Sequence, residues 1–226
     1  MAQNADLGIA FDGDADRVIV VDEKGNIQDG DKLLAIFADY MAGQGSLRGG
    51  AVVATNLSNM GLAGFCKERG LRFITTSVGD RHVMAAMETG GYNLGGEQSG
   101  HLILRDHSPT GDGQLAAVFL LKILFEKKCP LSALACAMEQ YPQVGIAVKV
   151  KEPTKETFEA AAKYRDAIGR VKEELGEDGR VIVRKSGTES VIRVMVEGRD
   201  LEQVQQLACE IAALLEEIDS ENPDKH

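Results

Sequence analysis

The chain has 226 residues, a formal net charge of −10 at pH 7 and a sequence pI near 5.0. This length allows one or two domains with a sizeable core, and the acidic balance argues against a nucleic-acid partner or an anionic membrane surface. No apolar run approaches the ~20 residues that span a bilayer, so we expect no membrane segment, and we expect no signal peptide. The four cysteines show no C-x-x-C pairing, which favours reduced thiols and a cytoplasmic protein.

Two short apolar strands, predicted at residues 7–11 and 18–22, flank an acidic loop. The loop reads Asp-Gly-Asp-Ala-Asp-Arg over residues 12–17. Its alternating spacing can direct three carboxylates, those of Asp12, Asp14 and Asp16, to one point. Oxygen-only donors of this kind suit a hard cation such as Mg2+. Arg17 beside them indicates a shared anionic ligand such as a phosphate.

Two other interpretations of the acidic loop are weaker. Asp and Gly favour turns, so the loop could be a polar hairpin turn, although three aligned carboxylates and an arginine exceed what a turn requires. The spacing also approaches an EF-hand, with Glu23 at the twelfth position. An EF-hand needs glycine at the sixth position, where this chain has Arg17, and the flanks are strand-like. We therefore reject the EF-hand.

After a turn at residues 23–26, the sequence alternates helices and strands with short connections. The predicted elements are helix 31–42, strand 51–54, helix 60–69, strand 71–76 and a helix from Val78–Arg81 to about Glu88. This alternation is typical of a parallel sheet with helices on both faces. Ligands gather at the carboxyl ends of such strands, where the loops 77–81 and 95–101 should lie. Gly79, Asp80 and Arg81 are therefore candidates for substrate binding, although Gly-Asp at a helix start is also common capping chemistry.

Predicted strands at 92–94 and 101–104 bracket a glycine-rich stretch. It reads Gly-Glu-Gln-Ser-Gly-His over residues 96–101. Glu97 and Ser99 could bond neighbouring hydroxyls of a polyhydroxylated ligand. His101 is a further candidate for substrate binding in this stretch. An ordinary glycine-rich turn remains open, and His101 by itself is more typical of a structural histidine.

Helices predicted at 112–127 and 131–139 complete this part, and we place a boundary near Gln140. The remainder predicts a strand, a helix, two strands and a helix, at 144–150, 154–174, 180–184, 190–197 and 200–218. The fold class is therefore α/β, followed by a smaller α+β domain at the C-terminal end.

Between the two later strands lies Arg-Lys-Ser-Gly-Thr-Glu, residues 184–189. Gly187 lets successive amides form an anion-binding concavity, and Ser186 and Thr188 add hydroxyl donors. Arg184, with Arg193 on the next strand, supplies charge for a phosphate. A hairpin turn with surface charges is the alternative, and Lys185 can simply be solvated.

Together these loops resemble the α-D-phosphohexomutase family. Its metal loop has the pattern D-G-D-x-D-R, its sugar loop G-E-x-S-G-H, and its phosphate loop is similar to residues 184–188. The Glu-Gln-Ser of the sugar loop, residues 108–113 and residues 192–198 most resemble the branch that acts on glucosamine phosphates. The phosphate loop departs from the family's R-P-S-G-T-E-P, because Lys185 and Ser190 replace both prolines.

The resemblance implies a Mg2+-dependent interchange of phosphate between O6 and O1 of an aminosugar through a phosphoserine. The family's serine loop is absent, since Ser-His-Asn occurs nowhere in the chain. Residues 1–28 would then be the end of domain 2, a remnant of a further α/β domain that carries the metal loop. Residues 29–140 would be the sugar-binding domain 3 and residues 141–226 the phosphate-binding domain 4. We expect the chain alone to be inactive.

By the same resemblance, the three aspartates would hold Mg2+ and Arg17 would neutralise the transferring phosphoryl group. Glu97 and Ser99 would orient sugar hydroxyls, and Arg184, Ser186, Gly187 and Thr188 would hold the phosphate that does not react. The expected partners are a hexose or hexosamine phosphate and the missing N-terminal half, without nucleic acid or membrane; a homodimer is left open. The alternatives are a mutase for glucose or mannose phosphates and a non-catalytic sugar-phosphate-binding module.

Overall fold

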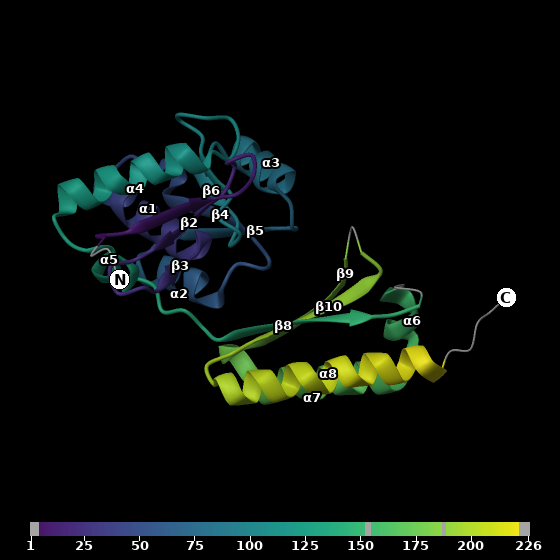
Figure 1. Cartoon of the computed structure of the whole chain (residues 1–226). Helices are drawn as coiled ribbons and strands as arrows, with labels where there is room; N and C mark the ends of the chain where they lie inside the picture. Colours follow the sequence, from purple (N-terminus) through teal and green to yellow (C-terminus); the bar gives the residue numbers. More distant parts are fainter. Residues whose placement is uncertain (1–4, 152–154, 187–188, 222–226) are drawn as a thin grey trace. The chain divides into compact units, whose positions relative to one another are not determined.

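The computed structural model describes residues 5–151, 155–186 and 189–221. These residues form two compact units, one up to Gln140 and one from Tyr141 onward (Figure 1). Among the described helices, none is both long and apolar enough to cross a membrane.

The first unit begins with a small antiparallel sheet. Strands β1 (Gly8–Phe11), β2 (Val18–Val21) and β3 (Ile27–Gln28) lie in the order β1-β2-β3. Phe11 pairs with Val18, so the acidic loop is the connection of a hairpin. Val18 and Val20 are buried while β1 is exposed along its length. The sequence did not predict β3, whose two residues are too few for an alternating pattern.

A four-stranded sheet follows, in the order β5-β4-β6-β7. Its strands are β4 (Ala51–Thr55), β5 (Arg72–Thr76), β6 (Leu94–Gly96) and β7 (Leu102–Leu104). β4 pairs in parallel with β5 and β6, whereas β7 is antiparallel to β6. The sheet is therefore mostly parallel, which confirms the predicted fold class.

Helices cover both faces of this sheet, as predicted. They are α1 (Gly30–Gly43), α2 (Met60–Glu68), α3 (Asp80–Gly90), α4 (Gly113–Lys127) and α5 (Leu131–Ala135), with a 3-10 turn at Arg48–Gly50. Val52 and Ala54 of β4 pack with α1, α2 and α4 in one core cluster. Ala51 and Val53 face the other way, against Val83 and Met87 of α3. This alternation along one strand is how a sheet buries both faces.

The second unit is a three-stranded antiparallel sheet in the order β8-β10-β9. Its elements are β8 (Gln143–Lys149), α6 (Lys155–Ala160), α7 (Ala162–Leu175), a 3-10 turn at Gly176–Asp178, β9 (Arg180–Lys185), β10 (Val191–Glu197) and α8 (Leu201–Glu221). Helices α7 and α8 lie on one side of this sheet (Figure 1). Alternate residues of β10, among them Ile192, Val194 and Val196, face the core that the sheet forms with α7 and α8.

Two predicted helices were too long. The helix predicted at 154–174 breaks at Ala161, whose backbone is extended, into α6 and α7. Phe158 and Tyr164 are both buried, yet six residues apart they would face different sides of one continuous helix, so the break lets both reach the core. The helix predicted at 131–139 ends at Ala135, and turns take the chain on to Gln140.

Candidate functional site

The acidic loop folds back on itself between β1 and β2. The Ala15 amide donates to the Asp12 carbonyl at 3.2 Å, and Ala15 takes a left-handed φ of 58°. The Arg17 amide donates to Asp12 Oδ1, also at 3.2 Å. A small side chain at position 15 suits this backbone, because a branched one would be strained there.

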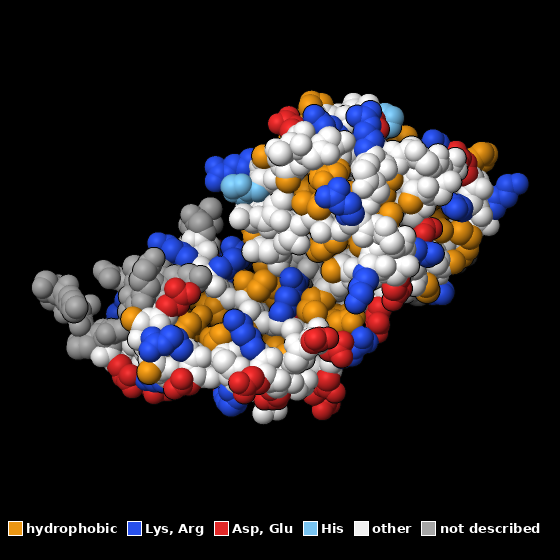
Figure 2. All heavy atoms as spheres, turned by 180° about the vertical axis from the view of Figure 1, so that it is seen from behind, with side chains coloured by type: hydrophobic (Ala, Val, Ile, Leu, Met, Phe, Trp, Pro, Cys, Tyr) orange, Lys and Arg blue, Asp and Glu red, His pale blue; other side chains and the backbone are white. Residues whose placement is uncertain are grey.

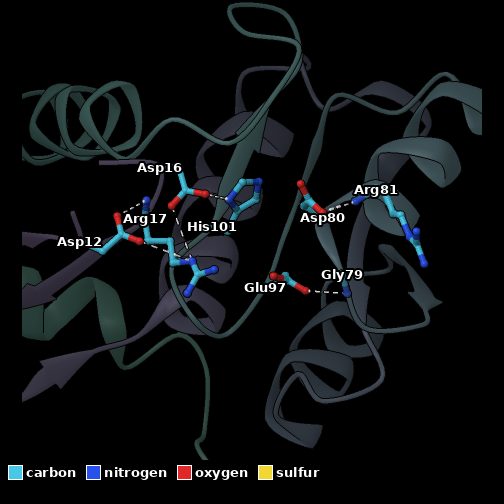
Figure 3. Close-up of polar contacts among 8 residues, drawn as sticks. All are labelled: Asp12, Asp16, Arg17, Gly79, Asp80, Arg81, Glu97 and His101. Atoms are coloured by element: carbon cyan, nitrogen blue, oxygen red, sulfur yellow. Dashed lines mark hydrogen bonds and ion pairs between the residues drawn. The ribbon is translucent and has the colours of Figure 1, made fainter. Parts of the chain in front are cut away.

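This turn gathers the three carboxylates. One oxygen each of Asp12, Asp14 and Asp16 lies within 4.8 Å of the other two. Asp16 Oδ1 is buried without a hydrogen-bond partner in the described part of the chain. Arg17 Nε lies 3.7 Å from Asp12 and 3.6 Å from Asp16 (Figure 3). These oxygen donors fit a hard divalent cation such as Mg2+, which would also coordinate the Asp16 oxygen that lacks a hydrogen bond.

His101 lies directly against this loop. Its side chain is buried, and its Nδ1 lies 3.1 Å from Asp16 Oδ2. Its backbone forms a β-bridge with Arg17, and the Val18 amide donates to the Gly100 carbonyl at 3.1 Å. The sequence grouped His101 with substrate-binding residues. The structure shows that its ring supports a carboxylate of the acidic loop, a contact between residues 85 positions apart that no local pattern reveals.

Glu97 joins the glycine-rich stretch to the start of α3. Its Oε1 accepts from the Gly79 amide at 3.0 Å (Figure 3). Asp80 Oδ1 accepts from the Arg81 amide at 2.7 Å, while the Arg81 guanidinium points away from the other labelled residues. Ser99 is exposed. The structure thus brings Glu97 and Gly79 into contact, with Asp80 nearby, and leaves Arg81 directed elsewhere.

Three glycines that the sequence reasoning passed over let these loops approach one another. A Cβ on Gly30 would lie 2.0 Å from the Glu97 carbonyl oxygen, and one on Gly113 would lie 2.6 Å from the Arg17 oxygen. A Cβ on Gly111 would meet the His101 ring at 2.3 Å. Gly30 also donates its amide to the Gln98 carbonyl at 3.0 Å. Gly30 and Gly113 each follow an aspartate, but in the sequence an Asp-Gly pair indicates only a turn.

The residues predicted to bind phosphate belong to the second unit. Arg184 of β9 pairs with Arg193 of β10, so both guanidinium groups leave the same face of the sheet. Burial, and then the charge of Arg193, lowers the pKa of Arg184. Arg193 Nη2 bonds Glu189 at 2.5 Å, whereas Arg184 has no carboxylate at ion-pair distance among the described residues.

The turn between β9 and β10 is partly described. Ser186 is buried, its amide donates to the Val191 carbonyl at 2.9 Å, and its hydroxyl accepts from the Glu189 amide at 3.3 Å. Gly187 and Thr188 lie outside the described residues. Their predicted part in the phosphate loop therefore stays a prediction.

Comparisons with known families match both parts of the chain. Residues 29–141 match "Phosphoglucomutase/phosphomannomutase, alpha/beta/alpha domain III". Residues 146–214 match "Phosphoglucomutase/phosphomannomutase, C-terminal domain".

Several curated relatives are phosphoglucosamine mutases. That of Nitratidesulfovibrio vulgaris (strain Miyazaki F) is 52% identical over 92% of this chain and 46% of the relative. That of Thermoanaerobacter sp. (strain X514) is 48% identical over 94% of this chain and 47% of the relative. The chain therefore spans about half the length of these relatives.

A solved structure has a similar fold at low identity. It is the N-acetylphosphoglucosamine mutase of Aspergillus fumigatus, in complex with GlcNAc-6P and magnesium. It superposes with a TM-score of 0.76 at 19% identity, over 93% of this chain and 48% of the other. At this identity the likeness concerns the fold.

Proposed function

The chain belongs to the phosphoglucomutase/phosphomannomutase family, and from that premise we propose that it is part of a phosphoglucosamine mutase. The proposed reaction interconverts glucosamine 6-phosphate and glucosamine 1-phosphate. The main support is the cluster of three carboxylate oxygens within 4.8 Å of one another, beside Arg17, in a chain 52% identical to a phosphoglucosamine mutase. Carboxylates this close repel one another, and a bound cation would remove that repulsion.

We propose Asp12, Asp14 and Asp16 as the ligands of Mg2+. His101 would hold Asp16 in place through Nδ1, because a hydrogen bond to one carboxylate oxygen fixes how the other is presented. When bound, the cation would supply positive charge that stabilises a phosphoryl group during transfer. Magnesium in the Aspergillus fumigatus structure agrees with this choice of cation.

Arg17 would assist the same transfer. Its Nε lies less than 4 Å from two of the aspartates, which hold the side chain at the loop. A guanidinium in that place can donate to phosphoryl oxygens that gain charge. We assign no general base.

The sugar and the second phosphate would bind elsewhere in the chain. Glu97 would accept hydrogen bonds from sugar hydroxyls, and Ser99 would donate hydrogen bonds to them or accept them. Gly79, Asp80 and Arg81, in the neighbouring loop, would also contact the sugar. Arg184, Ser186, Gly187, Thr188 and Arg193 would hold the phosphate that does not react. Arg184 is the strongest member of this group, because no described carboxylate competes for it.

We propose the family's domain order for the chain: residues 1–28 as the end of domain 2, 29–140 as domain 3 and 141–226 as domain 4. On this proposal turnover requires the part of the enzyme that carries the reactive serine, and the chain alone is inactive.

Exposed apolar surface on the first unit supports a contact with that part. On α4, Val118, Leu121 and Phe125 are 64%, 43% and 83% exposed, spaced as on one helical face. On β1, which contacts α4, Ile9 and Phe11 are 37% and 44% exposed. An apolar edge strand beside an apolar helix face is typical of a surface covered by a partner.

A chimera tests the proposed function. The portion of the Nitratidesulfovibrio vulgaris relative outside the matched region is joined to this chain, and mutase activity is measured by a coupled assay. We expect turnover of glucosamine phosphate in preference to glucose and mannose phosphates, and loss of activity in the Asp14→Asn chimera. Preference for glucose or mannose phosphates would replace the aminosugar assignment. A folded chimera without activity on any of the three would support a non-catalytic binding module.

A further inference from the structure

A groove of about 510 Å³ runs along one edge of the second unit, far in sequence from the acidic loop. Its lining on α7 includes Arg165, Ile168, Gly169 and Lys172, and residues 181–183 of β9 form the other wall. On the second unit, at the lower left of Figure 2, hydrophobic side chains lie open between lysine and arginine side chains. An apolar floor with basic residues beside it is suited to a ligand that is partly apolar and partly acidic.

The wall formed by β9 is an edge strand with unused backbone groups. β9 pairs with β10 on one side, and no described strand pairs with its other side. The Ser186 amide bonds the Val191 carbonyl, and the register places that pair in line with Arg184–Arg193 and Ile182–Met195. Because hydrogen-bonded pairs alternate in antiparallel ladders, Val181, Val183 and Lys185 direct their amides and carbonyls outward. These groups can bind an added strand.

The charge around the groove selects among occupants. The chain as a whole carries a net charge of −10, yet Arg165 and Lys172 are exposed on the α7 wall and Lys185 is exposed on β9. Arg165 donates Nη1 to the carbonyls of Glu159 and Ala160 at 2.7 Å, which holds its positive charge at this wall and leaves Nη2 and Nε for a ligand. Among the described residues, no carboxylate lies at ion-pair distance from Lys172 or Lys185; Glu159 is the acidic residue of the lining. Two copies pairing through this edge would bring like charges together, which disfavours a homodimer here. An acidic segment is favoured instead.

Gly169 offers further support. It lies within α7, where glycine costs about 1 kcal/mol relative to alanine. A Cβ at this position would meet no atom within 4 Å, so packing in the described chain does not require a glycine there. Its absent side chain leaves open space in the α7 wall of the groove, where another backbone can approach.

We propose that the groove between α7 and β9 binds an extended segment of another protein, added as a strand to β9. Arg165 and Lys172 are seven residues apart, roughly 10.5 Å along the helix. Two acidic residues four positions apart in a strand lie roughly 13 Å apart and point to one side. Their flexible side chains can make up the difference from the spacing of the two cations. The segment would therefore read acidic-x-apolar-x-acidic, with its apolar residue over Ile168 and Gly169.

A pair of blocked peptides tests this with the whole 226-residue chain. Acetyl-Ser-Glu-Thr-Val-Thr-Glu-Ser-amide is titrated into isotope-labelled chain and followed by NMR. We expect shifts at Val181, Val183 and Lys185, and slower hydrogen exchange of the outward amides. The same peptide with lysines in place of glutamates should bind at least tenfold more weakly.

Substitutions in the groove distinguish this binding from nonspecific binding of the peptides. Lys172→Glu should weaken binding of the acidic peptide at least tenfold and strengthen binding of the lysine-containing peptide. Gly169→Leu should block binding of both peptides while leaving the melting temperature of the chain unchanged or higher. Gly169→Ala serves as the matched control that retains binding. Equal binding of the two peptides, shifts that avoid β9, or no shifts at millimolar peptide would overturn the proposal.

Discussion

The acidic loop shows how single residues determine the chemistry available to this chain. Asp16 is held by His101 on one oxygen and left without a hydrogen bond on the other, among the described residues. Arg17 balances part of the negative charge without displacing the carboxylates from one another. The loop therefore presents open oxygen donors on a fixed backbone, as a cation site requires.

Replacing one carboxylate tests that site. We expect the chain to bind Mn2+ or Mg2+ weakly and Asp14→Asn to weaken binding at least tenfold, or about 1.4 kcal/mol. Asp14 is exposed, so folding should be unaffected. Calorimetry or a paramagnetic Mn2+ titration measures the change, with the exposed Asp166→Asn as control. Submicromolar binding that persists in Asp14→Asn would refute the three-carboxylate assignment.

At the phosphate loop, Arg184 and Lys185 provide a comparison between neighbours. We expect the chain to bind glucosamine 6-phosphate at roughly millimolar strength, near −4 kcal/mol. Arg184→Ala should remove a charge-assisted bond of about 1.5–3 kcal/mol, whereas Lys185→Ala should matter little, because that side chain is exposed. NMR shifts of residues 184–186 and 189 measure both. Shifts confined to residues 95–101, or unchanged in Arg184→Ala, would mean that phosphate binds elsewhere.

Asp22, which the sequence did not single out, organises the turn between β2 and β3. Burial disfavours the charged form of this carboxylate. Hydrogen bonds from the amides of Asn26 and Lys24 and from the side chains of Asn26 and Gln28 outweigh burial, and they lower the pKa of Asp22 from its ordinary value of 3.8. Its contribution to the free energy of unfolding is therefore present above pH ~3.8 and lost as pH falls through the folded-state pKa.

We accordingly expect Asp22→Asn to lower the free energy of unfolding by about 2 kcal/mol at pH 7. The difference from the unsubstituted chain should shrink as the pH falls below ~4. Urea unfolding followed by circular dichroism at several pH values measures this, with the exposed Asp6→Asn as control. A difference independent of pH would mean that the carboxylate charge is not what stabilises the turn.

At the scale of elements, α1 and the glycine-rich stretch depend on each other. α1 begins at Gly30 because Asp29 caps it, accepting from the Lys32 amide at 3.1 Å. The first residue of the helix then packs against the backbone of residues 97–100 without room for a side chain. The start of one helix thereby fixes the loop that holds Glu97.

The two end glycines of α1 make a matched pair. Gly30→Ala places a Cβ 2.0 Å from the Glu97 oxygen, and we expect a loss of about 2–3 kcal/mol of stability with a displaced loop. Gly43→Ala has nothing within 4 Å and should be neutral or slightly stabilising. Thermal unfolding and NMR shifts of residues 96–101 measure both. Equal effects would show that the close approach at Gly30 is absent in solution.

At the scale of the whole molecule, each unit has its own core. The second unit buries a cluster built from β8, β10, α7 and α8, with Ile192, Val196, Leu207 and Ile211 among its members. The strands that this cluster needs all lie after Tyr141. Because a separate core allows independent folding, the two units should unfold separately.

We therefore expect residues 141–226 to fold alone. Their NMR spectrum should overlay on the corresponding signals of the whole chain, since no residue of their core is removed. A shorter piece, residues 172–226, lacks β8 and most of α7 and should stay unfolded as the control. An unstructured 141–226 piece would mean that its core depends on the first unit.

The sequence by itself determined the order and kind of most elements, because the alternation of strands, helices and turns is local. It also singled out residues 12–17, 96–101 and 184–189, whose composition exceeds what turns require. Only the tertiary structure decided that His101 supports Asp16, that Glu97 bonds the Gly79 amide, and that Gly30, Gly111 and Gly113 lie at close approaches. It likewise decided that the helix predicted at 154–174 breaks at Ala161 and that β9 is left at an edge. Such features depend on which distant segments meet, and pairing between segments far apart in sequence leaves no trace in local composition or periodicity.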